Sequence, residues 1–157
     1  MKNWLVFSLI AILMMLSNKA SARIGETLDQ CKARYGEPVT VDGDTYTFMK
    51  NGLLVIVEFY ENKVDLIGFR KAEENALSIA ADMSDNEIQT ILSANGNGNN
   101  WRKREVISIN KEWEAEDVTM FAQYITMQNI LMIFTKEYLA RFDAAKKAKE
   151  NNNLKGF

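Results

Sequence analysis

The same helix-start signal occurs twice in this chain, and each copy is followed by three apolar runs. Thr27-Leu-Asp-Gln30 and Ser84-Asp-Asn-Glu87 both have the spacing of a capping box, in which the side chain at each end bonds a backbone N–H at the other. The runs behind them alternate between apolar and polar residues and are separated by turn residues, which is typical of antiparallel strands. The sequence therefore predicts an α+β fold of two α-β-β-β halves with antiparallel meander sheets and a C-terminal helix.

Two turns set the predicted strands of the first half at 44–50, 53–60 and 63–70. Asn51-Gly52 is a strong signal for a two-residue hairpin loop, and Glu61-Asn62 has the length of a second one. Because side chains alternate along a strand, counting from these turns places seven apolar residues on one face: Tyr46, Phe48, Val55, Val57, Phe59, Val64 and Leu66. The opposite face then carries Ile56, Tyr60, Ile67 and Phe69 among threonines and acids.

The second half shows three further apolar runs, at about 103–114, 118–126 and 129–135, with turns near Glu116-Asp117 and Met127-Gln128. The same counting predicts one apolar face made of Ile107, Ile109, Trp113, Met120, Ala122, Tyr124, Leu131 and Ile133, with Lys111 placed awkwardly among them. Thr135 is expected to cap a helix over 136–150, and the tail 151–157 is expected to be flexible.

Cysteine and histidine content limits the chemistry of this chain. The chain has one cysteine and no histidine, so neither an intramolecular disulfide nor histidine-based catalysis or metal binding is available to it. Aligning Thr27 with Ser84 places Cys31 over Ile88, an apolar position of the second predicted helix. We therefore expect Cys31 to act as a small buried hydrophobe, the alternative being a reactive thiol.

Residues 1–22 have the three parts of a cleavable signal peptide. Lys2 supplies the positive charge, residues 4–16 are almost wholly apolar, and Ala20-Ser21-Ala22 offers a cleavage site. The apolar run is shorter than the roughly 20 residues of a membrane span. A lipoprotein signal is an alternative, but Asp29 and Gln30 are not the small residues that should precede the cysteine. We expect a periplasmic or secreted protein with no integral membrane span after processing, and a single domain over 23–150 with halves at about 23–72 and 82–135.

The first half also resembles a known family. The resemblance rests on Gly25-x-Thr27, Tyr35-Gly36-Glu37-Pro38, the strand Leu53–Phe59 and the return Asn62-Lys63-Val64-x-x-Ile67. These features are similar to the small periplasmic lipoproteins of the outer-membrane β-barrel assembly machine and to the β-lactamase-inhibitor-protein fold, which places two such units in tandem. The resemblance implies a binding module or scaffold that holds another protein, and it transfers no individual functional residue.

Three other motifs each have a structural interpretation as well as a functional one. A shared strand face is predicted for Glu112, Glu114 and Glu116. They form either a strip that binds a cation or a basic partner, or a solvated strand end. The loop 95–100 is rich in Asn and Gly but lacks the strand, helix and lysine of a phosphate loop. Lysines near the end of the last helix, Lys146, Lys147 and Lys149, either touch anionic lipid or favour the helix dipole.

The net charge of −2 gives no basic surface for binding nucleic acid. The patterns described above predict no catalytic residue, cofactor site or metal site. The expected function is a non-enzymatic binding or scaffold protein of the cell envelope, whose partner is another protein or envelope component. The alternative is a secreted hydrolase that uses carboxylates alone. The candidate partner-binding residues are Tyr60, Phe69, Ile56 and Ile67, and the sequence leaves the ligand and the oligomeric state open.

Overall fold

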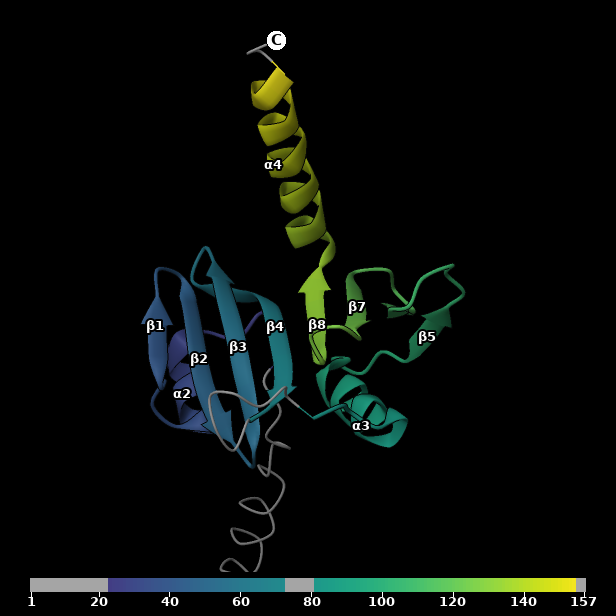
Figure 1. Cartoon of the computed structure of the whole chain (residues 1–157). Coiled ribbons are helices and arrows are strands. Elements are labelled where there is room, and N and C mark those ends of the chain that lie inside the picture. Colours follow the sequence, from purple (N-terminus) through teal and green to yellow (C-terminus); the bar gives the residue numbers. More distant parts are fainter. Residues whose placement is uncertain (1–22, 73–80, 155–157) are drawn as a thin grey trace, which may run out of the picture.

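One antiparallel sheet of eight strands, accompanied by three helices, makes up residues 23–72 and 81–154, the part of the chain that this computed structural model describes (Figure 1). The first half contains α2 (Leu28–Tyr35), β1 (Thr40–Asp42), β2 (Thr45–Lys50), β3 (Leu53–Tyr60) and β4 (Lys63–Lys71). The second contains α3 (Asp85–Asn95), β5 (Trp101–Arg104), β6 (Lys111–Ala115), β7 (Met120–Ile125), β8 (Ile130–Thr135) and α4 (Lys136–Leu154). The α+β class is confirmed. Each half has one strand more than predicted, and the halves share one sheet in the order β1-β2-β3-β4-β8-β7-β6-β5.

Both predicted capping boxes are present. The Thr27 amide donates to Gln30 Oε1 at 2.8 Å, and the Gln30 amide donates back to Thr27 Oγ1 at 3.4 Å. In the second box the Ser84 amide donates to Glu87 Oε2 at 2.8 Å, and the Glu87 amide donates to Ser84 Oγ at 3.3 Å. Each box pairs a backbone N–H at one end with a side chain at the other, which fixes where α2 and α3 begin.

A pseudo-twofold axis relates the two halves. In the first half Phe48 faces Val55, and Val55 in turn faces Phe69. In the second half Trp113 faces Ala122, and Ala122 in turn faces Ile133. Phe69 and Ile133 are therefore equivalent positions. The central strands β4 and β8 pair Phe69 with Leu131, Ile67 with Ile133 and, between these two pairs, Gly68 with Met132. The axis therefore passes through the Gly68–Met132 pair, and the antiparallel joint between the halves is self-complementary.

The core lies between one face of the sheet and the two short helices. Cys31 from α2 and Ile88 and Leu92 from α3 are buried against strand residues of both halves. Figure 1 shows α2 behind the strands of the first half. The expected equivalence of Cys31 and Ile88 is confirmed, because both side chains are fully buried in this one cluster. The strand residues of the cluster are Phe48, Val55, Val57, Val64, Ile67, Phe69, Trp113, Ala122, Tyr124, Leu131 and Ile133.

One predicted register is wrong, and the cause is a β-bulge. The pairs Phe48–Val55, Tyr46–Val57 and Phe59–Val64 are as predicted, but Val57 faces Ile67 rather than Leu66. The register shifts between Glu58 and Phe59, so β4 holds one extra residue after Val64. Every side chain of β4 beyond the bulge therefore changes face, and Ile67 and Phe69 enter the core while Leu66 leaves it.

Two predictions for the second half are also wrong. Residues 103–114 are not one strand, because β5 ends at Arg104, β6 begins at Lys111 and residues 105–110 form a loop between them. Ile107 and Ile109 lie on that loop and are exposed, at 110% and 68%. The last helix begins at Lys136 as expected but runs to Leu154, so the predicted flexible tail is helical over its first four residues. The predicted signal peptide, 1–22, lies outside the described residues.

Candidate functional site: the open face of the sheet

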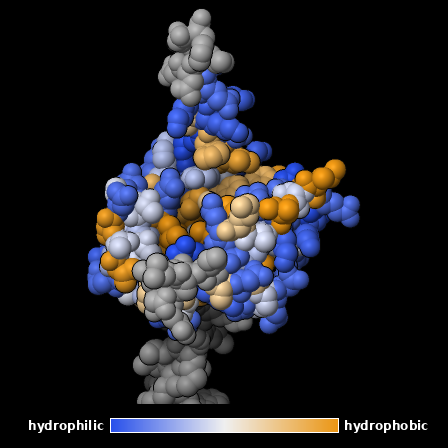
Figure 2. All heavy atoms as spheres, viewed as in Figure 1, coloured by the Kyte–Doolittle hydropathy of each residue, from blue (hydrophilic) through white to orange (hydrophobic). Residues whose placement is uncertain are grey.

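The face of the sheet opposite α2 and α3 is apolar at its centre and is called the open face here. Besides the exposed Met49 and Tyr60, strand register places eight apolar side chains on it: Leu54, Ile56, Leu66, Phe121, Ile125, Ile130, Met132 and Phe134. Of these eight only Leu66 is buried, and the rest are half-buried. Hydrophobic atoms gather on the sheet at the foot of α4 in Figure 2. A contiguous apolar area of this kind is typical of an interaction surface.

Gly68 leaves the middle of the open face without a protruding side chain. It pairs with Ile56 on β3 and with Met132 on β8, so it lies on the pseudo-twofold axis between two apolar side chains. A Cβ at this position would lie 3.1 Å from Ile130 Cδ1 and 3.7 Å from Ile56 Cβ. The missing side chain therefore gives Ile130 and Ile56 room to lie close to the sheet.

Four aromatic rings continue the open face onto α4. Phe121 and Phe134 are stacked across β7 and β8 with centroids 6.3 Å apart, and Phe134 lies 5.8 Å from Tyr138 on α4. Tyr138 is stacked in turn on Phe142 at 6.3 Å, and Phe142 is 57% exposed. Burial, and then the Glu58 carboxylate, raise the pKa of the Tyr138 hydroxyl above its ordinary value, so it stays a neutral donor. We call this row, Phe121, Phe134, Tyr138 and Phe142, the aromatic ladder.

The extra residue of the β4 bulge, Asp65, holds α4 at its base. Its carboxylate accepts from the Thr135 hydroxyl and forms an ion pair with the Arg141 guanidinium. Thr135 Oγ1 also accepts from the Tyr138 amide at 2.9 Å, which caps the helix. The Arg141 guanidinium lies 3.7 Å from the centroid of the Tyr60 ring, a cation–π contact. The bulge thus directs a carboxylate to the helix foot, and α4 projects from the end of the sheet (Figure 1).

Ion pairs border the open face on the side of the second half. Arg102 Nη2 lies 2.7 Å from Glu114 Oε2, and Arg104 Nη1 lies 3.3 Å from Glu112 Oε2. Glu116 accepts from Asn100 Nδ2 at 3.2 Å. Glu112 and Glu114 do share a side of β6, and β5 supplies a cation to each, whereas Glu116 lies on the turn after the strand. The acidic strip is therefore largely neutralised within the sheet.

The structure separates the four predicted partner-binding residues into two pairs. Ile56 lies on the open face, and Tyr60 is 48% exposed at the end of β3 beside Arg141. Ile67 and Phe69 lie in the core, at 0% and 5% exposure, so their placement on the outer face was wrong. Leu66 and Ile67 are adjacent apolar residues in an otherwise alternating strand, and this break in the alternation is the sequence signal for the bulge.

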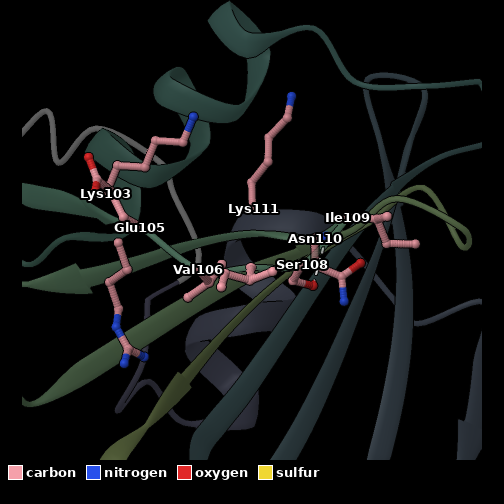
Figure 3. A pocket seen from close by; sticks show the side chains of 9 residues that line it. Lys103, Glu105, Val106, Ser108, Ile109, Asn110 and Lys111 are labelled. Atoms are coloured by element: carbon pink, nitrogen blue, oxygen red, sulfur yellow. Dashed lines mark hydrogen bonds between the residues drawn. The ribbon is translucent and has the colours of Figure 1, made fainter.

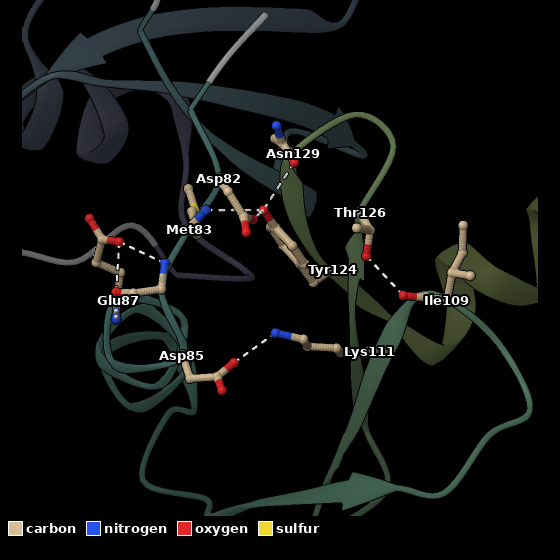
Figure 4. A network of polar contacts seen from close by, with 10 residues as sticks. Asp82, Met83, Asp85, Glu87, Ile109, Lys111, Tyr124, Thr126 and Asn129 are labelled. Atoms are coloured by element: carbon tan, nitrogen blue, oxygen red, sulfur yellow. Dashed lines mark hydrogen bonds and ion pairs between the residues drawn. The ribbon is translucent and has the colours of Figure 1, made fainter.

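A polar network at the start of α3 ties this helix to β6 and β7 (Figure 4). The Met83 amide donates to the Tyr124 hydroxyl at 3.1 Å, and that hydroxyl donates to the Asp82 carboxylate. Burial, followed by the hydrogen bond to Asp82, raises the pKa of Tyr124. Lys111 Nζ lies 2.7 Å from Asp85 Oδ1 and 5.7 Å from the centroid of the Tyr124 ring. The lysine that looked misplaced in the sequence thus has both a carboxylate and an aromatic face as partners.

The remaining sequence motifs have structural roles or lie exposed. Burial raises the pKa of Cys31 to about 12, so its thiol stays protonated and unreactive at neutral pH. The loop 105–110 with the strand ends beside it surrounds an open hollow of about 670 Å³ (Figure 3). In the Asn-Gly loop the Asn95 side chain donates to the Ile91 carbonyl at 2.7 Å, and Trp101 Nε1 donates to the Leu92 carbonyl at 2.7 Å. These bonds close the end of α3.

The described residues contain neither a candidate metal site nor a candidate membrane-spanning helix. Over 23–72 and 81–154, no three His, Cys, Asp or Glu side chains are grouped so that they could hold a metal ion. None of the helices in those ranges combines the length and the apolar character that a membrane crossing requires.

Comparison with known proteins gives no family for the chain. No protein-family model matches it, and no curated protein matches it. A solved structure of a cysteine-rich secretory protein from Staphylococcus aureus is 13% identical with a TM-score of 0.41, over 74% of this chain and 44% of that one. An extracellular protein with an SCP domain from Bacillus anthracis is 12% identical with a TM-score of 0.41, over 80% of this chain and 50% of that one. The alignments thus span about half the length of these proteins.

Proposed function

We propose that this protein is a non-enzymatic binding module of the cell envelope that holds a partner protein on the open face and the aromatic ladder. The observation that carries the proposal is the continuity of these two surfaces. Aliphatic side chains on four neighbouring strands, half-buried except for the buried Leu66, run into four rings that end at Phe142, which is 57% exposed. Aromatic side chains with a large exposed apolar area are enriched in binding hot spots.

Three surface carboxyl groups of the second half, Asp85, Glu87 and Asp117, are not suited to be the general acid of the alternative hydrolase. A general acid needs a carboxyl whose pKa is raised towards neutral pH. The Ser84 amide, the Ser84 hydroxyl and Lys71 lower the pKa of Glu87 to about 2, and Lys111 lowers that of Asp85. The Thr119 hydroxyl and amide lower the pKa of Asp117. These three carboxylates are ionised at neutral pH and are engaged in structural contacts.

The proposed location, periplasmic or secreted, rests on the signal-peptide pattern of residues 1–22. Mass spectrometry of the exported protein should show Arg23 at the N-terminus, without lipid. An uncleaved Met1, or diacylglycerol on Cys31, would contradict the location.

The docking surface can be tested with a photo-crosslinking amino acid at Ile56, on the open face, expressed in the native envelope. We expect crosslinking to one defined partner, and we expect Phe142→Ser to reduce it strongly while the melting temperature barely moves. The matched control is Met127→Ser, because Met127 is 82% exposed on the β7–β8 turn. Crosslinking that is equal in the Phe142→Ser and Met127→Ser proteins would refute the proposed surface.

A further inference from the structure

A small cavity of about 260 Å³ opens at the N-terminus of α2, away from the open face. Its lining includes two aromatic rings, Tyr46 and Phe59, in an edge-to-face arrangement with centroids 5.3 Å apart. It also includes two exposed carboxylates, Asp29 in the first turn of α2 and Asp44 in the β1–β2 turn. The cavity therefore combines aromatic surface with negative charge.

The start of α3 in the second half shows a related arrangement, built from other positions of the repeat, since Asp85 aligns with Leu28 and Tyr124 with Val57. Tyr46 faces Val57 in the first half and Lys111 faces Tyr124 in the second, so Lys111 occupies the position of Tyr46. Lys111 sends its ammonium group to Asp85 in the first turn of α3, at 2.7 Å, with the Tyr124 ring 5.7 Å away (Figure 4). The fold thus places a lysine ammonium between a first-turn carboxylate and an aromatic ring at the start of the second helix.

The first half has the carboxylates and the rings but no lysine of its own at this place. No lysine or arginine side chain of the described residues forms an ion pair with Asp29 or Asp44. Lys32, one turn along α2 from Asp29, is bonded to Glu37 at 2.8 Å and acts on Asp29 and Tyr46 only through longer-range electrostatic interaction. The two carboxylates are therefore available to a cation from outside.

We propose that this cavity binds the ammonium group of a lysine side chain presented by the partner protein. The cavity is smaller than the roughly 300–1,000 Å³ of sites for drug-sized ligands, so it suits a single side chain. An ammonium group gains both from carboxylates and from the faces of aromatic rings. The inference rests on the proposed function, since it names a chemical feature of the partner, but it concerns a separate surface.

Titration of the full mature chain with the peptide acetyl-Gly-Lys-Gly-amide, followed by amide NMR shifts, tests the site. We expect saturable shifts confined to the amides around Asp29, Asp44 and Tyr46. The same peptide with an ε-acetylated lysine should give none, because acetylation removes the charge. Equal shifts with the acetylated peptide, or shifts spread over the surface, would overturn the inference. n-Butylammonium chloride carries the same stem and charge as the lysine side chain, so it should compete with the peptide for the site, and a failure to compete would also overturn the inference.

Conservative variants separate binding from folding. Asp29→Asn combined with Asp44→Asn should weaken peptide binding about tenfold, which is a loss of about 1.4 kcal/mol. Tyr46→Leu keeps the apolar bulk and removes the ring face, so it should weaken binding with little change in the melting temperature. Glu137→Gln, on the exposed surface of α4, is the control and should bind normally. Unchanged affinity in both cavity variants would rule the site out.

The two proposals fail separately. Phe142→Ser tests the open face and should leave peptide binding intact, whereas Asp29→Asn with Asp44→Asn tests the cavity. If the peptide binds but Phe142→Ser leaves crosslinking at Ile56 unchanged, the docking surface is wrong and the cavity stands. If crosslinking depends on Phe142 but the peptide does not bind, the cavity assignment is wrong and the docking surface stands.

Discussion

The two halves of the sheet have the same strand register but different side chains at equivalent positions. Phe48 opposite Val55 in the first half becomes Trp113 opposite Ala122 in the second, a larger ring facing a smaller partner. All four side chains are buried. Because a protein interior is close-packed, the larger ring of Trp113 is matched by a smaller partner in this pair. The repeat therefore preserves the backbone pairing while the side chains of the pair change.

The halves differ more where the chain leaves the sheet. The first pair of strands is joined by Gly43-Asp44, and the equivalent strands of the second half are joined by the loop 105–110. The position of Tyr46 beside the cavity is taken by Lys111 beside Asp85. Positions that pack against the opposite half are constrained, whereas positions at strand ends have diverged.

Truncating the two equivalent rings should give the largest effect. Phe48→Ala and Trp113→Ala should each lower the free energy of unfolding by about 3–5 kcal/mol, since both rings are buried in the shared core. Denaturant melts of either variant should remain a single transition, because β4 and β8 join the halves into one sheet. A second transition in either variant would show that the halves unfold independently, and Met127→Ala serves as the exposed control.

The equivalent helix positions should differ in cost. Ile88→Ala removes more buried carbon than Cys31→Ala, so we expect a loss of about 2–5 kcal/mol for the first and about 1 kcal/mol for the second. Denaturant melts of both variants give the comparison. Native Cys31 should also resist a thiol reagent until the protein unfolds, since it is fully buried. Rapid labelling under native conditions would contradict the equivalence with Ile88.

Removing the bulge carboxylate should affect α4 more than the sheet. Asp65→Ala removes the partner of Arg141 and of the Thr135 hydroxyl, so we expect a loss of about 1.5–3 kcal/mol in unfolding free energy. Hydrogen exchange should show faster exchange of the amides in the first turns of α4. Asp143→Ala, on the exposed part of the same helix, is the control. Unchanged exchange in α4 would mean that Asp65 does not anchor it.

The smallest effect should come from the two capping boxes. Their contributions to stability should depend differently on pH, because one box contains a titratable carboxyl group and the other does not. Glu87 has a pKa of about 2 in the folded chain against about 4.3 when unfolded, so its stabilisation is complete above about pH 4.3 and is lost as the pH falls through about 2. Gln30 carries no charge. Glu87→Gln should therefore flatten the acid limb of stability measured by urea melts, and Gln30→Glu should steepen it. An acid limb that is the same in the Glu87→Gln protein would contradict this origin.

Local signals in the sequence determined most of the first half. The capping boxes at Thr27 and Ser84, and the hairpin loops Asn51-Gly52 and Glu61-Asn62, act within a few residues and appear in the structure as predicted. In both loops the backbone has positive φ at each central residue, which asparagine and glycine tolerate and which Glu61 adopts at a steric cost. The equivalence of Cys31 and Ile88 is confirmed as well, because both positions follow from helix periodicity.

Only the tertiary structure decided the faces of β4, the strand β5 and the open face. A bulge is set by what the extra residue can reach, and Asp65 reaches Arg141, which is distant in the sequence. The sequence predicts a strand over the loop 105–110 because its isoleucines alternate, but this pattern carries no information about whether a partner strand is present. The joining of β4 to β8 depends on two strands that are remote along the chain and fit about a common axis, so no local pattern could have shown that one face of an eight-stranded sheet is left open.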